Sequence, residues 1–309
     1  MTTPRTPATL DPNGHDAPRP APTPRALDGL IGRLRRIVGE EGCLVRPGEL
    51  FAYECDGLTL SPKRPLAVVL PTTTEQVVAI VRACREADVR FVPRGAGTGL
   101  SGGAHATERS ILIECSRMNR ILEVDAENRF AVVQPGVVNA ELSTAVASHG
   151  LFYAPDPSSQ QACTLGGNVA ENSGGPHTLK YGTTTNHVLA LELVLPDGTV
   201  QRFGSRTGES PGFDFVGAIV GSEGTLGVVT EATVRLTPIP KAVETLLVLF
   251  DDVVGACRAV GRVIRSGVVP AALEIVDRRT IEAVEASVYA AGLPVTAGAV
   301  LIVELDGLP

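Results

Sequence analysis

The stretch from Arg94 to Gly103, RGAGTGLSGG, decides the fold, because Gly97, Gly99 and Gly102 match the dinucleotide-binding pattern G-x-G-x-x-G. The apolar strand VRFVP precedes it and the apolar strand SILIEC follows it. In a Rossmann unit the glycines open a helix that crosses back to a parallel strand. Only AHATER separates this loop from the second strand, whereas such a crossover needs about 10 to 12 residues. The spacing therefore excludes an NAD site of the Rossmann type.

The loop also fails as a phosphate-binding P-loop, because G-x-x-x-x-G-K-[ST] requires a lysine that this stretch lacks. Two interpretations remain open from these residues alone. The loop is either a flexible, hairpin-like connection between two strands, or an anion-binding nest. In a nest, successive backbone N–H groups point inward, and here Thr98 and Ser101 would lie beside them.

Two further glycine-rich segments favour a ligand. Residues 154–182 carry few large apolar side chains, and a loop of this length inside a compact domain is usually functional. Residues 221–238 place a third glycine cluster just before a strand of alternating pattern. Three such segments predict that the backbone approaches one long, polar, phosphate-bearing ligand at several points.

The composition narrows the class of protein. The chain has 309 residues, enough for about two domains, and 44% of them are apolar. It has 27 basic and 34 acidic residues and a pI near 5.4 without a basic block, so nucleic acid is not expected as a partner. Its six cysteines show neither a C-x-x-C pair nor zinc-ligand spacing, which predicts reduced thiols and no metal. No apolar run approaches the roughly 18 residues of a membrane span, and no signal-peptide core is present, so we expect a cytoplasmic protein that is not integral to a membrane.

Local patterns outside the glycine segments predict the surrounding elements. Residues 1–25 are rich in Pro, Thr and Ala and are expected to form a disordered tail. The apolar spacing of residues 27–38 predicts a helix that Gly42 ends. Thr72 and Glu75 form an S/T-x-x-E capping box and predict the start of a second helix. Toward the C-terminus, strand and helix patterns alternate and predict a sheet with helices on one face.

Five motifs in their order along the chain resemble a known family. They are PRGAGTGLSGG, PDPSS, TLGGNVAENSGG, KYG and GSEGTLGVVTEATVRL. They resemble the FAD-binding (PCMH-type) domain of the vanillyl-alcohol oxidase and para-cresol methylhydroxylase superfamily, in particular the FAD-linked glycolate oxidase subunit and the D-lactate and D-2-hydroxyglutarate dehydrogenases. The likeness runs from about Tyr53 to the end of the chain.

The resemblance implies an α+β fold in two parts. Residues 26–240 would form a two-part FAD-binding domain. Residues 241–309 would form the start of a substrate-side cap domain, a partial α/β unit with a ferredoxin-like sheet. In the resembling enzymes the cap continues well beyond this point, so the chain is expected to be truncated.

The resemblance also implies which residues contact FAD. Backbone N–H groups of the first glycine loop would wrap the pyrophosphate, with Thr98 and Ser101 as side-chain donors. Residues of the second segment would line the flavin and its ribityl chain, and residues of the third would complete the adenine and ring contacts. The implied contacts are Arg94, Gly95, Ala96, Gly97, Thr98, Gly99, Leu100 and Ser101, then Pro155, Asp156, Pro157, Ser158, Thr164, Gly167, Asn168, Ser173 and Gly174, then Glu223, Gly227, Val228 and Val229.

Four residues bear on attachment and catalysis. Some relatives bond FAD covalently through a histidine in the first loop, and Thr98 takes that place here, so FAD is expected to be held without a covalent bond. His105 lies just beyond the loop and is the less favoured covalent link. Cys163 is one residue out of register for a second attachment that a few relatives carry. His177 either approaches the flavin edge or substrate, or is a turn residue with local hydrogen bonds.

The activity that the resemblance implies is oxidation of a small 2-hydroxy acid, such as glycolate or D-lactate, to the 2-oxo acid by hydride transfer to FAD. The catalytic base, and the histidines that bind a divalent metal in some members, are expected in the absent C-terminal part. An iron–sulfur partner subunit is compatible with this activity and would place the chain at the inner face of a membrane. The alternatives are a flavoprotein that oxidises another alcohol or a sugar, and a non-catalytic flavin-holding subunit.

Overall fold

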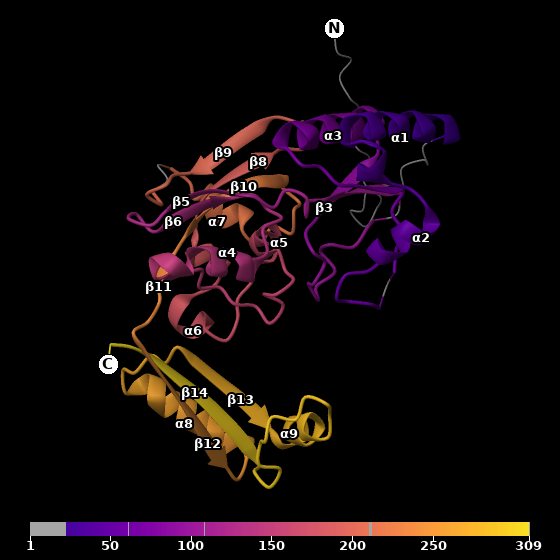
Figure 1. Cartoon of the computed structure of the whole chain (residues 1–309). Helices are drawn as coiled ribbons and strands as arrows, with labels where there is room; N and C mark the ends of the chain where they lie inside the picture. Colours follow the sequence, from indigo (N-terminus) through magenta and orange to yellow (C-terminus); the bar gives the residue numbers. More distant parts are fainter. Residues whose placement is uncertain (1–22, 61, 108, 210–211, 309) are drawn as a thin grey trace.

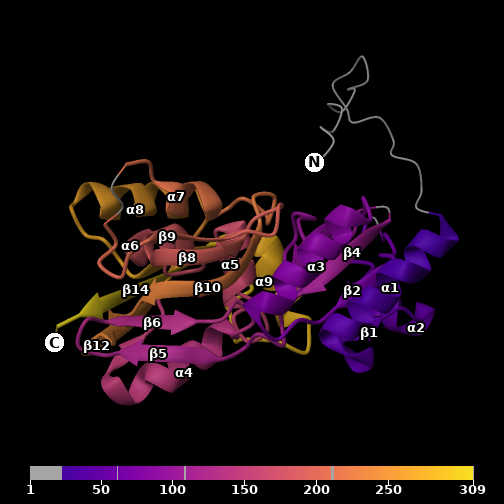
Figure 2. The ribbon, with the colours of Figure 1, turned by 90° about the horizontal axis from the view of Figure 1, so that it is seen from above.

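The computed structural model describes residues 23–60, 62–107, 109–209 and 212–308 (Figure 1). Residues 1–22 of the predicted tail lie outside this part, and its last residues already belong to helix α1 (Pro24–Val38). Three larger sheets and one two-stranded ribbon organise the described residues, and Figure 2 shows the first two larger sheets side by side when seen from above. None of the helices in the described ranges is long and apolar enough to cross a membrane.

The first sheet is covered by two long helices. Its strand order is β1-β2-β4-β3, and α1 and α3 bury Leu34, Ile80 and Val81 against it. This amphipathic packing is the reason that the helices form where the sequence predicts them. The elements are β1 (Cys43–Leu44), β2 (Ala67–Val69), α3 (Thr74–Glu86), β3 (Arg90–Arg94) and β4 (Ser110–Glu114). The short helix η1 (Glu40–Gly42) precedes β1, and the short helices α2 (Pro47–Leu50) and η2 (Phe51–Tyr53) lie between β1 and β2.

The end of α1 and the start of α3 each differ by one to a few residues from the boundary that the sequence predicts. Helix α1 ends at Val38, and Gly39 rather than Gly42 follows it, with a φ of 80° that favours glycine. Helix α3 is capped by Thr73 rather than Thr72, because the Thr73 hydroxyl accepts a hydrogen bond from the Gln76 backbone N–H.

The glycine loop joins two neighbouring parallel strands. Strand β3 pairs with β4 in parallel, with Val92 opposite Leu112. The hairpin-like connection is therefore wrong, and so is the argument that the segment is too short to link parallel strands. The whole stretch from Gly95 to Arg109 makes the crossover, not only the residues after the glycines. No helix occurs in its described residues, so the exclusion of a Rossmann unit stands.

The second sheet has five antiparallel strands in the order β5-β6-β10-β8-β9. Helices α4, α5 and α7 bury one face of it, with Leu142, Leu165 and Leu191 fully enclosed in that core. Strand β10 is the last of these five strands along the chain but occupies the centre of the sheet. The elements are β5 (Ile121–Asp125), β6 (Phe130–Val133), α4 (Asn139–Val146), η3 (Ala147–His149), α5 (Leu165–Glu171), η4 (Thr184–Asn186), β8 (Val188–Val194), β9 (Val200–Gly204), α7 (Phe215–Ile219) and β10 (Val228–Arg235).

The segment 154–182, expected to be one long loop, contains α5 and a second short helix, α6 (Thr178–Tyr181). Thr164 caps α5, since its hydroxyl accepts a hydrogen bond from the Gly167 N–H at 3.3 Å. A two-stranded ribbon of β7 (Leu151–Phe152) and β11 (Thr237–Pro238) lies at the edge of this part.

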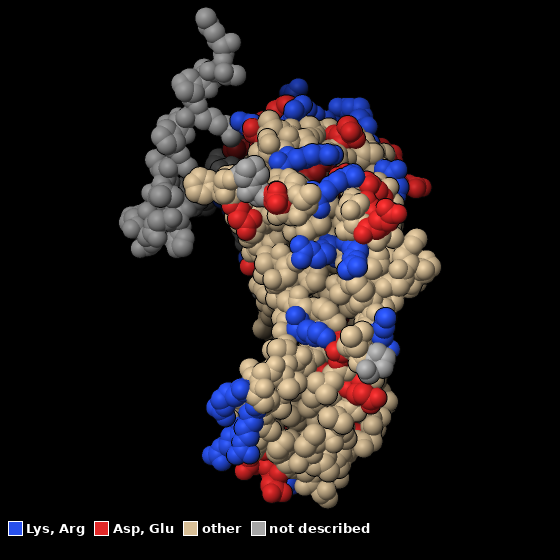
Figure 3. Space-filling model, turned by 90° about the vertical axis from the view of Figure 1, so that its left-hand side faces the viewer, with Lys and Arg blue, Asp and Glu red and all other residues tan. Residues whose placement is uncertain are grey.

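The C-terminal part is a separate three-stranded sheet with the order β12-β14-β13, in which the central strand β14 is antiparallel to both neighbours. The predicted alternation is present, although the last helix is shorter than its pattern suggests. Figure 1 shows this part below the other two sheets, and Figure 3 shows a narrower waist between them. The predicted boundary between residues 240 and 241 stays a prediction. The elements are β12 (Ala242–Phe250), α8 (Val253–Arg265), β13 (Ala272–Asp277), α9 (Arg278–Glu285) and β14 (Ala299–Gly307).

Candidate functional site

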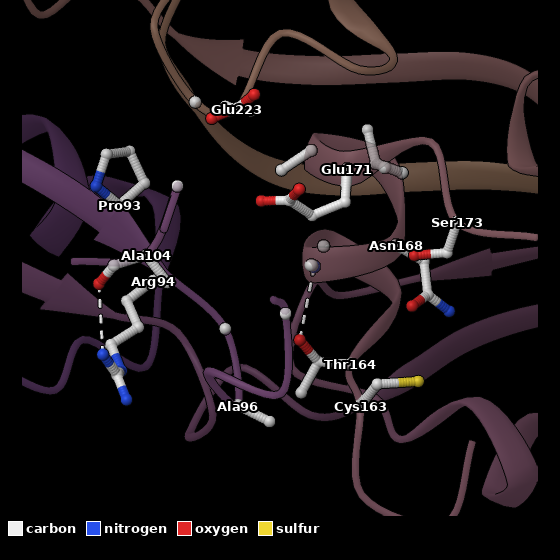
Figure 4. A pocket seen from close by; sticks show the side chains of 18 of the residues that line it. Pro93, Arg94, Ala96, Ala104, Cys163, Thr164, Asn168, Glu171, Ser173 and Glu223 are labelled. Carbon is white, nitrogen blue, oxygen red and sulfur yellow. Dashed lines mark hydrogen bonds between the residues drawn. The ribbon is translucent and has the colours of Figure 1, made fainter. Parts of the chain in front are cut away.

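The three glycine-rich segments meet around one cavity of about 400 Å³, a size typical of ligand sites (Figure 4). The cavity lies where the parallel crossover faces α5 and the loop before β10. The expected contact residues that line it are Arg94, Gly95, Ala96, Gly97, Thr98, Gly99, Leu100, Ser101, Pro157, Thr164, Gly167, Asn168, Ser173, Gly174, Glu223, Gly227, Val228 and Val229.

Three expected contact residues, Pro155, Asp156 and Ser158, do not line the cavity. Asp156 instead faces His177, whose Nδ1 lies 2.6 Å from its Oδ2. The lining also contains Glu171 of α5, which is not among the residues that the sequence motifs imply. A carboxylate among glycines and small residues is the signal that could have identified Glu171.

The Arg94 side chain stabilises the glycine loop through hydrogen bonds to backbone carbonyls. Its side chain is buried, its Nη1 donates to the Ala104 carbonyl at 3.1 Å, and its Nη2 donates to the Cys55 carbonyl at 2.8 Å. Figure 4 shows the guanidinium turned toward Ala104. Burial lowers the pKa of Arg94, and the nearby carboxylates of Glu114 and Asp56 oppose that shift. The arginine therefore ties the crossover, at Ala104, to the segment that precedes β2, at Cys55.

The glycines of the first loop are required by close packing. Gly97 has a φ of 68°, and a Cβ there would collide with the Arg94 guanidinium. A Cβ at Gly95 would collide with the Thr164 hydroxyl. The loop therefore lies directly against α5 and against its own arginine, and its backbone is left to face the cavity.

His105 turns away from the cavity. Its Nε2 lies 2.7 Å from Asp56 Oδ1 and 3.0 Å from the Leu58 carbonyl, and it is not among the lining residues. Cys163 does line the cavity, where burial raises the pKa of its thiol. A protonated thiol is a weak nucleophile, which matches a packing role.

Asn168 gives the cavity an unsatisfied donor. Its side chain is 1% exposed, and its Nδ2 has no hydrogen-bond partner among the described residues. The Cys163 thiol lies beside it, but sulfur accepts hydrogen bonds only weakly. Because burying a polar group without a partner is costly, this donor fits a ligand that carries acceptor oxygens. A bound dinucleotide supplies such oxygens.

His177 lies at the contact between the second sheet region and the C-terminal sheet, outside the cavity lining. Its Nε2 is 2.7 Å from Glu304 Oε1 on β14. Burial lowers the pKa of His177, but hydrogen bonds to Asp156 and Glu304 raise it more, and the net pKa is raised. Nearby, Lys180 and Tyr181 both contact the Asp306 carboxylate. Within the described residues no three His, Cys, Asp or Glu side chains form a group that could hold a metal ion.

Two family descriptions match the chain in succession. The FAD binding domain matches residues 65–204, and the C-terminal domain of FAD linked oxidases matches residues 239–309. The chain belongs to the FAD-linked oxidase family. FAD is accordingly its cofactor, as the sequence motifs imply.

Two curated relatives in the FAD-linked oxidase family are identical to this chain at 50% and 42% of the aligned positions. The glycolate oxidase subunit GlcD of Escherichia coli is 50% identical over 260 residues, which are 84% of this chain and 52% of the relative. The D-lactate dehydrogenase of Archaeoglobus fulgidus is 42% identical over 239 residues, 76% of this chain and 53% of the relative. The chain thus spans about half the length of these curated relatives.

Solved structures confirm the expected PCMH-type fold of this family. Alkyldihydroxyacetonephosphate synthase superimposes with a TM-score of 0.77 and 23% identity, over 100% of this chain and 60% of that protein. Substrate-bound p-cresol methylhydroxylase superimposes with a TM-score of 0.78 and 20% identity, over 92% of this chain and 61% of that protein. At such identities the likeness concerns the fold alone.

Proposed function

We propose that this chain is the flavin-binding part of an oxidoreductase that converts a small 2-hydroxy acid, such as glycolate or D-lactate, to the 2-oxo acid. The observation that carries the proposal is a cavity bounded by three glycine-rich segments, in a chain that is 50% identical to a glycolate oxidase subunit over the aligned residues. The D-lactate dehydrogenase relative supports the same substrate class.

In this proposal the backbone N–H groups from Gly95 to Gly99 hold the cofactor pyrophosphate, since the loop presents backbone rather than side chains to the cavity. The unsatisfied Nδ2 of Asn168 donates to an acceptor oxygen of the cofactor. The cofactor is held without a covalent bond, because Thr98 stands in the loop and His105 is engaged by Asp56.

When bound, FAD supplies the acceptor for the hydride that leaves the substrate α-carbon. The chain's own residues bind and orient the cofactor and cover it. The pair of carboxylates around His177 occupies both of its ring nitrogens, so we assign this histidine to holding the C-terminal sheet rather than to proton transfer. We assign no catalytic base to the described residues.

The first test is cofactor content. The purified 309-residue chain should show flavin absorption bands, and after denaturation and filtration these should pass into the filtrate. Flavin that stays with the denatured chain would contradict non-covalent binding. A folded chain, checked by circular dichroism, that takes up no added FAD would overturn the proposal.

The second test is the substrate class. Anaerobic addition of glycolate or D-lactate to the flavin-loaded chain should bleach the flavin bands, because hydride transfer reduces the flavin. Acetate, which has no hydroxyl group, should leave them unchanged. Bleaching by a sugar or simple alcohol alone would favour the alternative substrate class, and no bleaching by any of them would favour a flavin-holding subunit.

A further inference from the structure

A second cavity, an open groove of about 690 Å³, lies on the second sheet. The turn between β5 and β6, the loop after β9 and the end of β10 form its walls. It shares no lining residue with the cavity that we assign to FAD. We call it the arginine groove, because its lining includes Arg129, Arg206 and Arg235 beside Phe130, Leu189 and Leu236.

The arginine groove lies on the face of the sheet that points away from α4, α5 and α7. Phe130 and Leu189 belong to a small apolar cluster of their own, whereas Ala131 and Val133 belong to the core beneath these helices. Successive side chains of a strand point to opposite faces, so Phe130 points away from the helices. Arg235 of β10 pairs with Phe130 of β6, and its side chain therefore shares that outer face.

The backbone places Arg129 beside Arg235. The Leu236 N–H donates to the Arg129 carbonyl at 2.8 Å, and the Arg235 N–H donates to the His187 carbonyl at 2.7 Å. Both arginines are thus fixed at their backbone, one register position apart on neighbouring strands. Their side chains reach the same groove from these two positions.

Arg129 and Arg235 carry charge that the fold does not neutralise. Neither side chain has a hydrogen bond or ion pair to any residue that the structure describes. Arg206 differs, since its guanidinium donates to both oxygens of Glu123, at 2.9 and 2.6 Å, and lies over the Phe130 ring. Arg206 therefore forms a wall of the groove, and the other two guanidinium groups are left to bind a ligand.

Asp125 does not neutralise these arginines, although it is the only carboxylate among the described lining residues. Its two oxygens accept hydrogen bonds from the backbone N–H and the side-chain amide of Asn128, at 2.9 and 2.8 Å. These bonds lower the pKa of Asp125 and hold its charge within the turn. With three arginines and one aspartate, the groove is positive in a chain whose formal net charge is -7. Such a groove attracts anions.

A second observation, the backbone at Arg129, also indicates a ligand. Arg129 ends the turn between β5 and β6 with a φ of 58°, a conformation that glycine adopts more easily than any residue with a Cβ. The turn therefore carries an arginine at a position where glycine would be less strained. Because the described fold makes no hydrogen bond or ion pair with this side chain, its use is expected outside the fold, in binding.

From these observations we propose that the arginine groove binds a small molecule through a carboxylate or phosphate group, with Arg129 and Arg235 as the donors. A guanidinium donates two parallel hydrogen bonds to such a group. The volume of the groove lies in the range of small-molecule sites. This site goes beyond the proposed function, since it contains none of the residues that we assign to the cofactor.

The test measures binding of inorganic phosphate, of citrate and of a hexaglutamate peptide to the full chain by titration calorimetry. The chain is loaded with FAD beforehand, so that the backbone N–H groups of the first cavity do not compete for these probes. Arg129→Gly and Arg235→Gln are the groove variants. Arg109→Gly is the matched control, because Arg109 is also exposed and has a φ of 62° but lies outside the groove.

Phosphate or citrate should bind the wild-type chain, and each groove variant should weaken this binding roughly tenfold or more, because a charged donor is lost. The control should bind as the wild type does. Added salt should weaken the binding, since exposed charges are screened. The thermal midpoint of the Arg129→Gly protein without probe should not fall, because glycine adopts this φ readily. A purely structural role for Arg129 would lower that midpoint and leave binding unchanged.

Equal binding of phosphate and citrate by the wild type and both groove variants would overturn the proposal, and so would the absence of binding by the wild type. Binding of hexaglutamate alone would also overturn it, and would assign the groove to an acidic segment of a partner protein. If the chain holds no FAD, the proposed function fails, but the same comparison in the FAD-free chain still tests the groove.

Discussion

His177 Nε2 lies 2.7 Å from Glu304 Oε1, although the two residues are 127 positions apart in the chain. The other ring nitrogen lies 2.6 Å from Asp156 Oδ2, so one imidazole links the second glycine-rich segment to the central strand of the C-terminal sheet. Lys180 and Asp306 form an ion pair beside it. The contact between the two parts of the molecule is thus charged, with a titratable histidine at its centre.

Because the pKa of His177 is raised in the folded protein, its charged form stabilises the contact. This contribution is fully present below the unfolded pKa of about 6.5 and is lost as the pH rises through the higher folded pKa. The difference in thermal midpoint between the wild-type chain and His177→Gln should therefore be larger near about pH 6 than near about pH 9. His149→Gln, at an exposed position, is the control. A difference that grows with pH would contradict this assignment.

Comparing substitutions of Gly97 and Gly150 should distinguish the effect of backbone strain from the effect of a side chain that collides beside the cavity. Gly97 and Gly150 share a φ of 68°, but a Cβ at Gly150 meets no atom within 4 Å, whereas one at Gly97 collides with Arg94. Gly97→Ala should abolish FAD binding, measured by flavin fluorescence. Gly150→Ala should cost only about 1–2 kcal/mol of unfolding free energy and keep the cofactor. Retention of flavin by Gly97→Ala would show that the loop does not touch it.

Asn168→Leu should weaken the cofactor without weakening the fold. Its Nδ2 has no hydrogen-bond partner among the described residues, so the substitution removes an unsatisfied buried donor from the ligand-free chain. We expect FAD affinity to fall about tenfold, with little change in the ligand-free thermal midpoint. Asn139→Leu is the opposite case, because its Nδ2 donates to the Pro155 carbonyl at 2.9 Å. That variant should lose about 1–3 kcal/mol of stability, and equal losses in both variants would argue against a ligand role for Asn168.

The six thiols should differ in reactivity. Burial raises the pKa of both Cys84 and Cys115 to about 12, so at neutral pH these thiols stay protonated and enclosed. Cys257 is exposed. A thiol-specific chromogenic reagent should therefore modify Cys257 first in the native chain, and Cys257→Ser should remove that fast phase. Rapid native modification of Cys84 would contradict the packing of the first sheet.

The sequence predicts those features of the fold and of the candidate site that depend on residues close to one another in the chain. The first glycine loop stands between two apolar strands, and both its position and its approach to a ligand-sized cavity follow from local pattern. The parallel pairing of Val92 with Leu112 does not, because a connection without a helix carries no periodic signal. The distance along the chain from His177 to Glu304 likewise hides their contact, since periodicity reports only the faces of single elements.

Helix boundaries show the same limit at a smaller scale. Thr72 and Thr73 are chemically identical candidates for the cap of α3, each followed three residues later by Glu or Gln, and in the structure it is the Thr73 hydroxyl that accepts from the Gln76 N–H. Glu171 could have been identified, because a carboxylate in a segment of glycines and small residues is unusual. Its proximity to Glu223 could not, since two separate glycine-rich segments must fold together to create it.

Because β10 is the central strand of its sheet, the sheet can be completed only after β10 has been translated. Strands β6 and β8 are translated before β10, and neither can form its pairing with β10 until that strand has been made. Glu223 and Gly227, which close the cavity, emerge from the ribosome just before that strand. A nascent chain arrested before residue 221 should hold no flavin, because one wall of the cavity has not yet been translated. Capture of the cofactor therefore has to wait until all three glycine-rich segments have been translated.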